Sequence, residues 1–134
     1  MLPLITHITR VLHSVIREQL KKITRSSKWA GVRKQAIKDN PRCACCGDTK
    51  FLQVHHFLPF NVSPTLELDP KNLVVMCMGK NECHLLIGHG DNFKKYNPYL
   101  AADIKNIQSG ILSLEDAQKL AKKVAIFCPT DLEN

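Results

Sequence analysis

Residues 43–89 read CACCGDTKFLQVHHFLPFNVSPTLELDPKNLVVMCMGKNECHLLIGH. They hold five of the six cysteines in the chain and four of its six histidines. Cysteine thiolates and histidine imidazoles are the ligands that zinc and similar divalent ions prefer. The stretch therefore predicts metal chemistry, and we interpret the rest of the sequence by how it supports this stretch.

Four of the cysteines have a spacing that is typical of a zinc knuckle. Cys43 and Cys46 are separated by two residues and precede Gly47, so both thiolates can reach one tetrahedral ion from a tight turn. Cys77 and Cys83 are their predicted partners, because the glycine-containing segment between them can loop out. The arrangement predicts a structural zinc ion whose binding is coupled to folding. The alternative is a set of reduced cysteines without metal.

The other two cysteines have less defined roles. Cys45 is a spare thiol that can replace a neighbouring ligand if the turn is twisted, and Cys128 is predicted to be a buried or free thiol. The sequence shows no secretory signal, and histidines lie beside the cysteines, which favours metal binding in a reducing compartment over disulfides. Arg10, Arg17 and Glu18 interrupt the apolar N-terminus, so no membrane span is predicted. We expect a cytoplasmic protein, located in the host cytoplasm if a phage encodes it.

The 134 residues fit a single domain with a core of its own, and their charge is unevenly distributed. Residues 1–42 contain ten Lys/Arg and two acidic residues, whereas residues 43–134 contain nine Lys/Arg and ten acidic residues. Such a concentration of cations favours an anionic polymer as partner, because phosphate binding releases counterions. We predict that basic residues 10–42 bind DNA, most simply double-stranded DNA. A solvated basic helix face is the alternative.

Two helices are predicted before the cysteines. The apolar residues between Leu4 and Leu20 have helical spacing, and Arg25 is expected to continue the far end of that helix. Its apolar face is expected to pack on the rest of the chain or on a second subunit, so the protein is a monomer or a homodimer. Ser26-Ser27 caps a second helix that ends at Asp39-Asn40-Pro41. Trp29 is expected to be a core anchor of this second helix.

The middle of the chain is predicted to form a strand, a long loop, a second strand and a helix. The strands are expected at residues 51–57 and 73–76, with a loop of about fifteen residues between them. The short helix is expected at residues 82–87. Two further helices are predicted in the tail, one capped by Asn97 and the other beginning at Ser113. This succession indicates an α+β protein.

His55 and His56 are adjacent on the first predicted strand, where neighbouring side chains normally point to opposite faces. Pro59 can make the strand end or twist there, so that one imidazole binds a divalent cation while the other takes a proton from water. His84 follows Cys83 directly, and on a helix its side chain is turned by about 100° from that of Cys83. Cys83 can then face the knuckle while His84 faces a second ion.

These residues resemble the His-Asn-His (HNH) endonuclease family, in the branch that contains a zinc knuckle. The segments that carry the resemblance are Val54-His55-His56-x-x-Pro59, Asn72-Leu73-x-x-Met76-Cys77 and Cys83-His84, preceded by Trp29-x-x-Val32-Arg33 and Pro41-x-Cys43-x-x-Cys46-Gly47. The resemblance covers roughly residues 28–90. It implies a ββα-metal core with a structural zinc knuckle at residues 43–90, flanked by helical parts at residues 1–42 and 91–134.

The resemblance also implies the hydrolysis of DNA phosphodiesters with one catalytic divalent ion, Mg²⁺, Mn²⁺, Ni²⁺ or Zn²⁺. It assigns His56 as the general base, His55 and His84 as ligands of that ion, and Asn72 as the residue that holds the long loop by backbone hydrogen bonds. The implied reaction is in-line attack on phosphorus by a water that His56 deprotonates, which leaves a 5′ phosphate and a 3′ hydroxyl. His89 is a candidate further ligand or phosphate contact.

Two spacings depart from the pattern of the family. Five residues separate Cys77 from Cys83 instead of the usual two, and the five-residue offset from His84 to His89 is poorly aligned on a regular helix. The alternative functions are a catalytically inert, zinc-stabilised DNA-binding module and an RNA-directed nuclease. The complete set of histidines with Asn72 favours the DNA endonuclease, in a phage, mobile-element or restriction setting.

Overall fold

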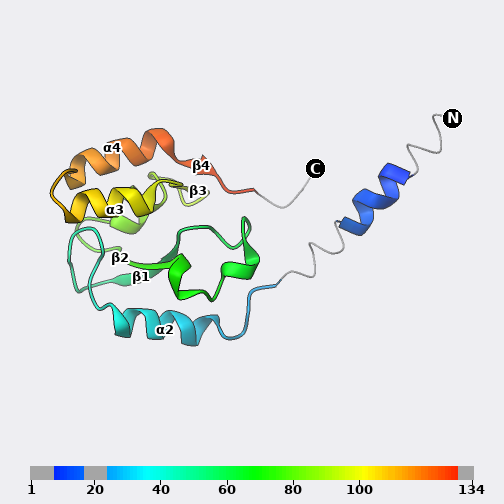
Figure 1. Ribbon diagram of the computed structural model, residues 1–134, viewed down its shortest axis with the longest axis horizontal. Coiled ribbons are helices and arrows are strands. Elements are labelled where there is room, and N and C mark those ends of the chain that lie inside the picture. The colour runs from blue at the N-terminus through cyan, green and yellow to red at the C-terminus, as the bar shows by residue number, and fades with distance from the viewer. Residues whose placement is uncertain (1–7, 17–23, 130–134) are drawn as a thin grey trace.

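The computed structural model describes residues 8–16 and 24–129 (Figure 1). The elements within residues 24–129 are, in chain order, α2 (Trp29–Asp39), β1 (Leu52–His56), the 3-10 turns η1 (Pro64–Leu66) and η2 (Pro70–Asn72), β2 (Leu73–Cys77), the π-helical turn η3 (His84–Gly88), β3 (Lys95–Tyr96), α3 (Leu100–Gln108), α4 (Leu114–Val124) and β4 (Ile126–Phe127). The strands form two small antiparallel sheets, β1–β2 and β3–β4. The fold is therefore α+β, as the sequence predicted.

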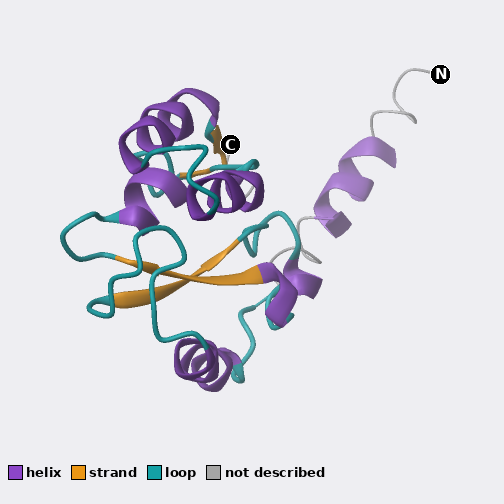
Figure 2. Cartoon of the chain, turned by 60° about the vertical axis from the view of Figure 1, so that its left-hand side comes forward, coloured by secondary structure: helices purple, strands orange, loops and turns teal. Residues whose placement is uncertain are grey.

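The β1–β2 hairpin lies between two helical layers. Its register pairs Leu52 with Cys77 and His56 with Leu73. Helix α2 packs on one face of the hairpin, η3 packs on the other, and α4 covers η3 (Figure 2). Because successive strand residues alternate between faces, Gln53 and His55 face η3, whereas His56 faces α2. The alternation explains why two adjacent histidines enter different surroundings.

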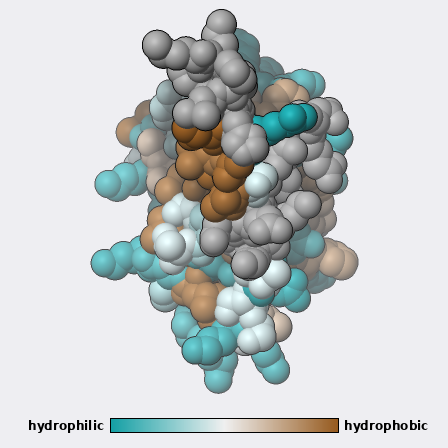
Figure 3. Space-filling model, turned by 90° about the vertical axis from the view of Figure 1, so that its right-hand side faces the viewer, coloured by the Kyte–Doolittle hydropathy of each residue, from teal (hydrophilic) through white to brown (hydrophobic). Residues whose placement is uncertain are grey.

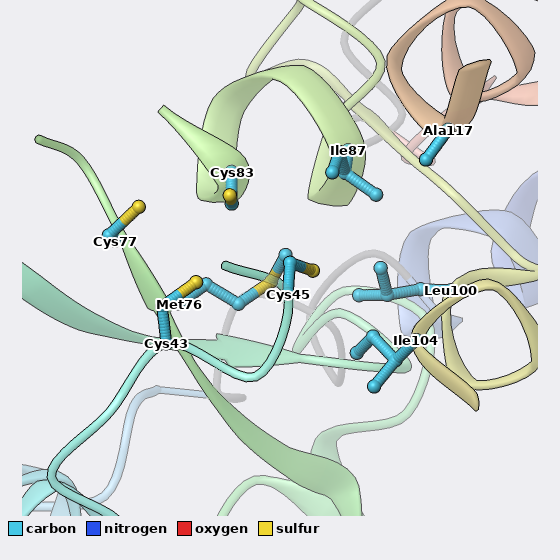
Figure 4. Close-up of a cluster of buried hydrophobic side chains, with 9 residues drawn as sticks. All are labelled: Cys43, Cys45, Met76, Cys77, Cys83, Ile87, Leu100, Ile104 and Ala117. Atoms are coloured by element: carbon cyan, nitrogen blue, oxygen red, sulfur yellow. The ribbon is translucent and has the colours of Figure 1, made fainter. Parts of the chain in front are cut away.

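The core is built around the sulfur atoms of the knuckle. Met76, Cys77, Cys83 and Ile87 have no exposed surface. They meet Leu100 of α3, together with Ala117 of α4 (Figure 4). Few large apolar side chains take part, and two of these four buried residues are cysteines of the predicted knuckle, so a metal ion bound there would stabilise the core directly.

The second tail helix begins at its predicted cap, Ser113, whereas the first has Tyr99 as its N-cap instead of the predicted Asn97 and begins at Leu100. Ser113 accepts a hydrogen bond from the backbone N–H of Asp116 at the start of α4, and Asn97 accepts one from that of Tyr99 just before α3. Asn97 is almost completely buried and also donates to Asp103. Ala117 and Ala121 of α4 are buried, whereas Leu120 is 40 % exposed.

The N-terminal part differs from the expectations in two ways. Residues 8–16 are helical, but their apolar side chains do not pack on the described rest of the chain, since those of Ile8, Val11, Leu12, Val15 and Ile16 are all 44–57 % exposed. Figure 3 views the side of the molecule on which this helix lies and shows hydrophobic surface there. The remainder of the predicted helix, residues 4–7 and 17–20, lies outside the described residues. None of the described helices has the length and apolar character of a membrane span.

Arg25 does not continue the first helix, contrary to the prediction. It lies in an irregular segment before α2, where its Nε donates to Glu67 Oε1 at 2.7 Å. The carboxylate of Glu67 is almost fully buried and also accepts from the backbone N–H of Ser26 at 3.0 Å. A buried carboxylate needs such partners, so this contact accounts for the position of Arg25.

Candidate metal centres and the histidine site

Four cysteines form the first candidate metal centre. The Sγ atoms of Cys43, Cys46, Cys77 and Cys83 all lie within 4.8 Å of one another, and those of Cys46 and Cys77 are 3.6 Å apart. Tetrahedral zinc with Zn–S bonds of about 2.3 Å needs sulfur atoms about 3.8 Å apart. The cluster could therefore hold a zinc ion, with the four ligands predicted from the sequence.

Local backbone geometry produces this cluster from two distant segments. Gly47 has a φ of +76°, and its N–H donates to the carbonyl of Cys43, which closes the first turn. The longer gap before Cys83 is taken up by a second turn, in which the N–H of Glu82 donates to the carbonyl of Gly79. The five-residue spacing is thus compatible with four converging thiols.

Cys45 is a fifth sulfur beside the cluster. It is 9 % exposed and belongs to the buried core. Hydrogen bonds from the thiols of Cys45 and Cys83 lower the pKa of Cys43, which favours a thiolate at that position. Burial raises the pKa of Cys77. Cys128 is a half-buried free thiol that belongs to neither metal cluster.

Three histidines form the second candidate metal centre. One ring nitrogen from each of His55, His84 and His89 lies within 4.8 Å of the others. The ring centroids are 4.7 to 5.1 Å apart, so the three imidazoles form a nearly regular triangle. We call these residues the histidine triad. His89, which the spacing left undecided, belongs to it.

A π-helical turn brings His89 into the triad. η3 spans His84–Gly88, and His89 follows as its C-cap. In a π-helix the hydrogen bonds join residues five apart, which places such residues above one another, and these turns are frequent at functional sites. The short helix expected at residues 82–87 is thus present as a π-helical turn at His84–Gly88. Because the π turn is wider than an α-helical turn, His84 and His89, which are five residues apart, lie on the same face of it.

Hydrogen bonds fix the tautomers of two triad members. His84 Nδ1 donates to Gln53 Oε1 at 2.7 Å, and His89 Nδ1 donates to the carbonyl of Lys95 at 2.6 Å. Each Nε2 therefore carries a lone pair, and these two atoms lie 3.2 Å apart. His55 Nε2 is a buried nitrogen without a hydrogen-bond partner among the described residues. Imidazole lone pairs that converge without donors are a donor set suited to a divalent cation.

Burial keeps the triad unprotonated. It lowers the pKa of His84 to about 4, with a contribution from His89. Burial and the neighbouring histidines lower the pKa of His55 well below its ordinary value, and burial also lowers that of His89. Metal binding requires neutral imidazole, so the site is in its binding form at neutral pH.

Gly88 allows the triad to pack closely. A Cβ atom at this position would lie 3.2 Å from both Cε1 and Nδ1 of His55 and 3.5 Å from Sδ of Met76. The backbone of η3 can approach His55 only because Gly88 has no side chain. The sequence contained the glycine, but its close approach to His55 depends on the packing of η3 against β1.

His56 lies outside the triad and has a separate set of contacts. Its Nε2 donates to the carbonyl of Glu67 at 2.9 Å, which leaves the lone pair on Nδ1. Its ring lies against that of Trp29, with centroids 4.5 Å apart. Trp29 is only half-buried, so it is a wall beside His56 rather than the predicted core anchor. Burial lowers the pKa of His56, and the charge of Arg25 contributes in the same direction.

Glu67 links His56 to the segment before α2. Its carbonyl holds His56, and its carboxylate holds Arg25 and the backbone of Ser26. The guanidinium of Arg25 lies over the rings of Trp29 and Phe60, at 5.5 and 4.8 Å from their centroids. Although burial raises the pKa of Glu67, the donors from Ser26 and Arg25 lower it overall. No motif or spacing in the sequence indicated this role for Glu67.

Asn72 ties the long loop to the hairpin. Its Oδ1 accepts from the backbone N–H of Leu58, and its Nδ2 donates to the carbonyls of Leu58 and Leu66. These are backbone hydrogen bonds of the kind expected of Asn72. The loop is ordered by them and by η1 and η2, so it is not structureless.

No protein-family model, curated protein or solved structure matches the chain. Its interpretation therefore depends on the geometry of the two clusters and on the motif.

Proposed function

We propose that this protein is a metal-dependent endonuclease that hydrolyses DNA phosphodiesters, with a ββα-metal core composed of β1, β2 and η3. The proposal depends above all on one observation: ring nitrogens of His55, His84 and His89 converge at one site, and His56, the residue after His55 on β1, has its tautomer fixed by the carbonyl of Glu67. The resemblance to HNH endonucleases points to the same residues. A structural zinc ion at the cysteine cluster would stabilise this arrangement.

His56 is the proposed general base. The carbonyl of Glu67 can only accept, so it holds His56 with the proton on Nε2 and the lone pair on Nδ1. The lowered pKa keeps the imidazole neutral, which is the form that can take a proton from water. His55 and His56 are neighbours at the end of β1, so a phosphate bound there is proposed to meet both.

His55, His84 and His89 are the proposed ligands of the catalytic ion. A divalent ion bound there supplies Lewis-acid stabilisation of negative charge on the phosphate oxygens. Gln53 and the carbonyl of Lys95 orient two of these ligands. Asn72 holds the loop that contains Glu67, and so contributes to the orientation of His56. Gln53, Lys95 and Asn72 thus have positioning roles, the triad has a binding role, and His56 has the proton-transfer role.

Helix α2 and its flanks are the proposed contact with the DNA backbone. The exposed cations of this region are Lys28, Arg33, Lys34, Lys38 and Arg42. They lie on the same side of the hairpin as His56. Lysine and arginine contacts to phosphates set affinity and register but do not read bases, so this surface accounts for binding without defining a sequence preference.

A supercoiled-plasmid assay with Mg²⁺, Mn²⁺, Ni²⁺ or Zn²⁺ tests the proposal. Wild type is expected to nick or linearise the plasmid with at least one ion, whereas His56→Ala and His84→Ala are expected to lose cleavage while retaining DNA binding. His13→Ala is the matched control, because His13 is exposed on the helix at residues 8–16, outside the triad. Linear product would indicate paired active sites, and nicked product alone a single one.

Two outcomes would contradict the assignment. Undiminished nicking by His56→Ala would remove the general base from the proposal. A wild-type protein that binds DNA but is inert with every ion would instead identify a zinc-stabilised DNA-binding module.

A further inference from the structure

An exposed aromatic ring lies beside the histidine triad. Phe93 is 54 % exposed, and its ring centroid is 4.9 Å from that of His89 and 5.9 Å from that of His84. One side of the phenyl ring therefore covers two proposed metal ligands, while the rest is open to solvent. A group bound at the triad would lie next to this ring.

Backbone contacts fix the segment that contains Phe93. The carbonyl of Lys95 accepts from His89 Nδ1, so the segment is attached directly to the triad. β3 pairs with β4, and the N–H of Cys128 donates to the carbonyl of Lys94 at 2.8 Å. The C-terminal strand thus holds residues 93–95 next to the proposed metal ligands.

A second exposed aromatic lies on β4, the strand that pairs with β3. Phe127 lies opposite Lys95 in the β3–β4 pair and is 64 % exposed. Lys95 Nζ lies 4.7 Å from its ring centroid. Lys94 is exposed. The carboxylate of Asp91 forms an ion pair with Lys122, with Oδ2 3.7 Å from Nζ. We call Phe93, Lys94, Lys95 and Phe127 the aromatic–lysine patch.

The chemistry of the patch suits unpaired nucleotides. Aromatic side chains stack on the faces of bases, and ammonium groups bind the phosphates between them. In a duplex the base faces are already stacked on one another, so exposed phenyl rings gain nothing from it. The surface around α2 differs in this respect, because its aromatic ring, Trp29, is half-buried between His56 and Arg25, whereas Phe93 and Phe127 are more than half exposed.

We propose that the aromatic–lysine patch binds unpaired DNA nucleotides next to the phosphate held at the triad. This inference rests on the proposed function, since it takes DNA as the substrate. It makes the patch a specificity-determining surface that favours single-stranded or branched DNA over a continuous duplex. The C-terminal part of the chain thereby acquires a role in substrate choice in addition to packing.

Binding measurements with a cleavage-deficient protein test the inference. Full-length His56→Ala is titrated into a fluorescein-labelled oligothymidylate of about 16 nucleotides, and separately into a duplex of the same length, with anisotropy as the readout. Adding Phe93→Leu with Phe127→Leu is expected to weaken single-strand binding by roughly five-fold or more for each base that loses its stacking partner. Duplex affinity is expected to stay unchanged. Phe93→Trp is expected to retain single-strand affinity.

Phe51→Leu is the matched control, because Phe51 is 73 % exposed but precedes the opposite end of β1. A parallel Ni²⁺ titration separates stacking from shielding of the triad. The inference is overturned if the leucine variants bind the single strand as tightly as the parent, if they lose duplex and single-strand affinity equally, or if they lose only Ni²⁺ affinity. Because no cleavage is measured, a wild-type protein without nuclease activity would contradict the proposed function and leave this result standing.

Discussion

His84 Nε2 and His89 Nε2 lie 3.2 Å apart with a lone pair on each. Their other ring nitrogens donate to Gln53 Oε1 and to the carbonyl of Lys95, so neither ring can turn its N–H toward the other without losing a hydrogen bond. Two acceptors at this distance repel each other unless a cation or a proton lies between them. With burial lowering both pKa values, a divalent cation fits this position better than a proton.

Removal of the side chain that orients His84 should weaken metal binding at the triad. Gln53→Ala leaves His84 Nδ1 without its acceptor, and loss of such a partner typically lowers metal affinity about 10- to 100-fold. A Ni²⁺ titration against a competing chelator measures the change. Gln35→Ala is the control, because Gln35 is an exposed glutamine on α2 whose side chain donates to Asp39 Oδ1 at 2.7 Å. Equal affinities for the two variants would show that Gln53 does not orient His84.

Cleavage should fall in acid with a midpoint below pH 6.5. The general base must be neutral, and burial lowers the pKa of His56 from its ordinary value of 6.5. Activity is therefore complete above that value and is lost as the pH falls through the lowered pKa of His56. The pH dependence of kcat/KM at saturating metal measures the midpoint. A midpoint above 6.5 would contradict a neutral, buried His56 as the base.

The cysteine cluster should control folding, whereas Cys128 should not. Cys83→Ser replaces a fully buried ligand of the knuckle and is expected to abolish cooperative thermal unfolding, as is removal of zinc with a strong chelator. Cys128→Ser changes a half-buried thiol outside the cluster and is expected to alter Tm little. Bound zinc and thermal unfolding are measured for both variants. Zinc content unchanged in Cys83→Ser would indicate that Cys45 has replaced the lost ligand.

Two glycines should respond in opposite directions to the same substitution. Gly90 has a φ of +60°, and a Cβ there would lie 2.5 Å from Cβ of Ala125 and 2.7 Å from the carbonyl oxygen of Ala121. Gly90→Ala is expected to lower the free energy of unfolding by roughly 2–5 kcal/mol. Gly31 lies within α2 with open space around it, so Gly31→Ala should raise it by about 1 kcal/mol. Chemical denaturation measures both, and a stabilising Gly90→Ala would contradict the packing of α4 on η3.

The cysteine cluster could be predicted from the sequence because its cysteines occur in two local pairs. A glycine in or next to each pair indicates the turn that brings the two thiols together. The histidine triad could be predicted only in part. His89 was left undecided, since the offset rule assumes regular helical spacing and the wider π turn depends on how η3 packs between β1 and α4. The position of Gln53 beside the triad could have been predicted, because Gln53 lies two residues before His55 and therefore on the same face of the strand.

Other parts of the site depend on contacts between distant segments. Glu67 contacts Arg25 across 42 residues, and its carbonyl contacts His56 across 11. Phe93 reaches the triad only because β4 holds its segment in place. Neither residue type nor local spacing marks such positions. The apolar face of residues 8–16 was predicted to pack on the chain or on a second subunit, and the first of these is wrong for the described residues.

One peptide bond joins the two candidate metal centres, since Cys83 belongs to the knuckle and His84 to the triad. An ion in the knuckle would fix Cys83, the N-cap of η3, and so reduce the entropy lost when the triad closes on its own ion. Loading of the knuckle is then expected to tighten the triad. Thermodynamic linkage makes the effect reciprocal, so an ion at the triad must tighten the knuckle by the same factor. Metal binding at the two centres would thus be cooperative, and loss of the ion from one centre would weaken binding of the ion at the other.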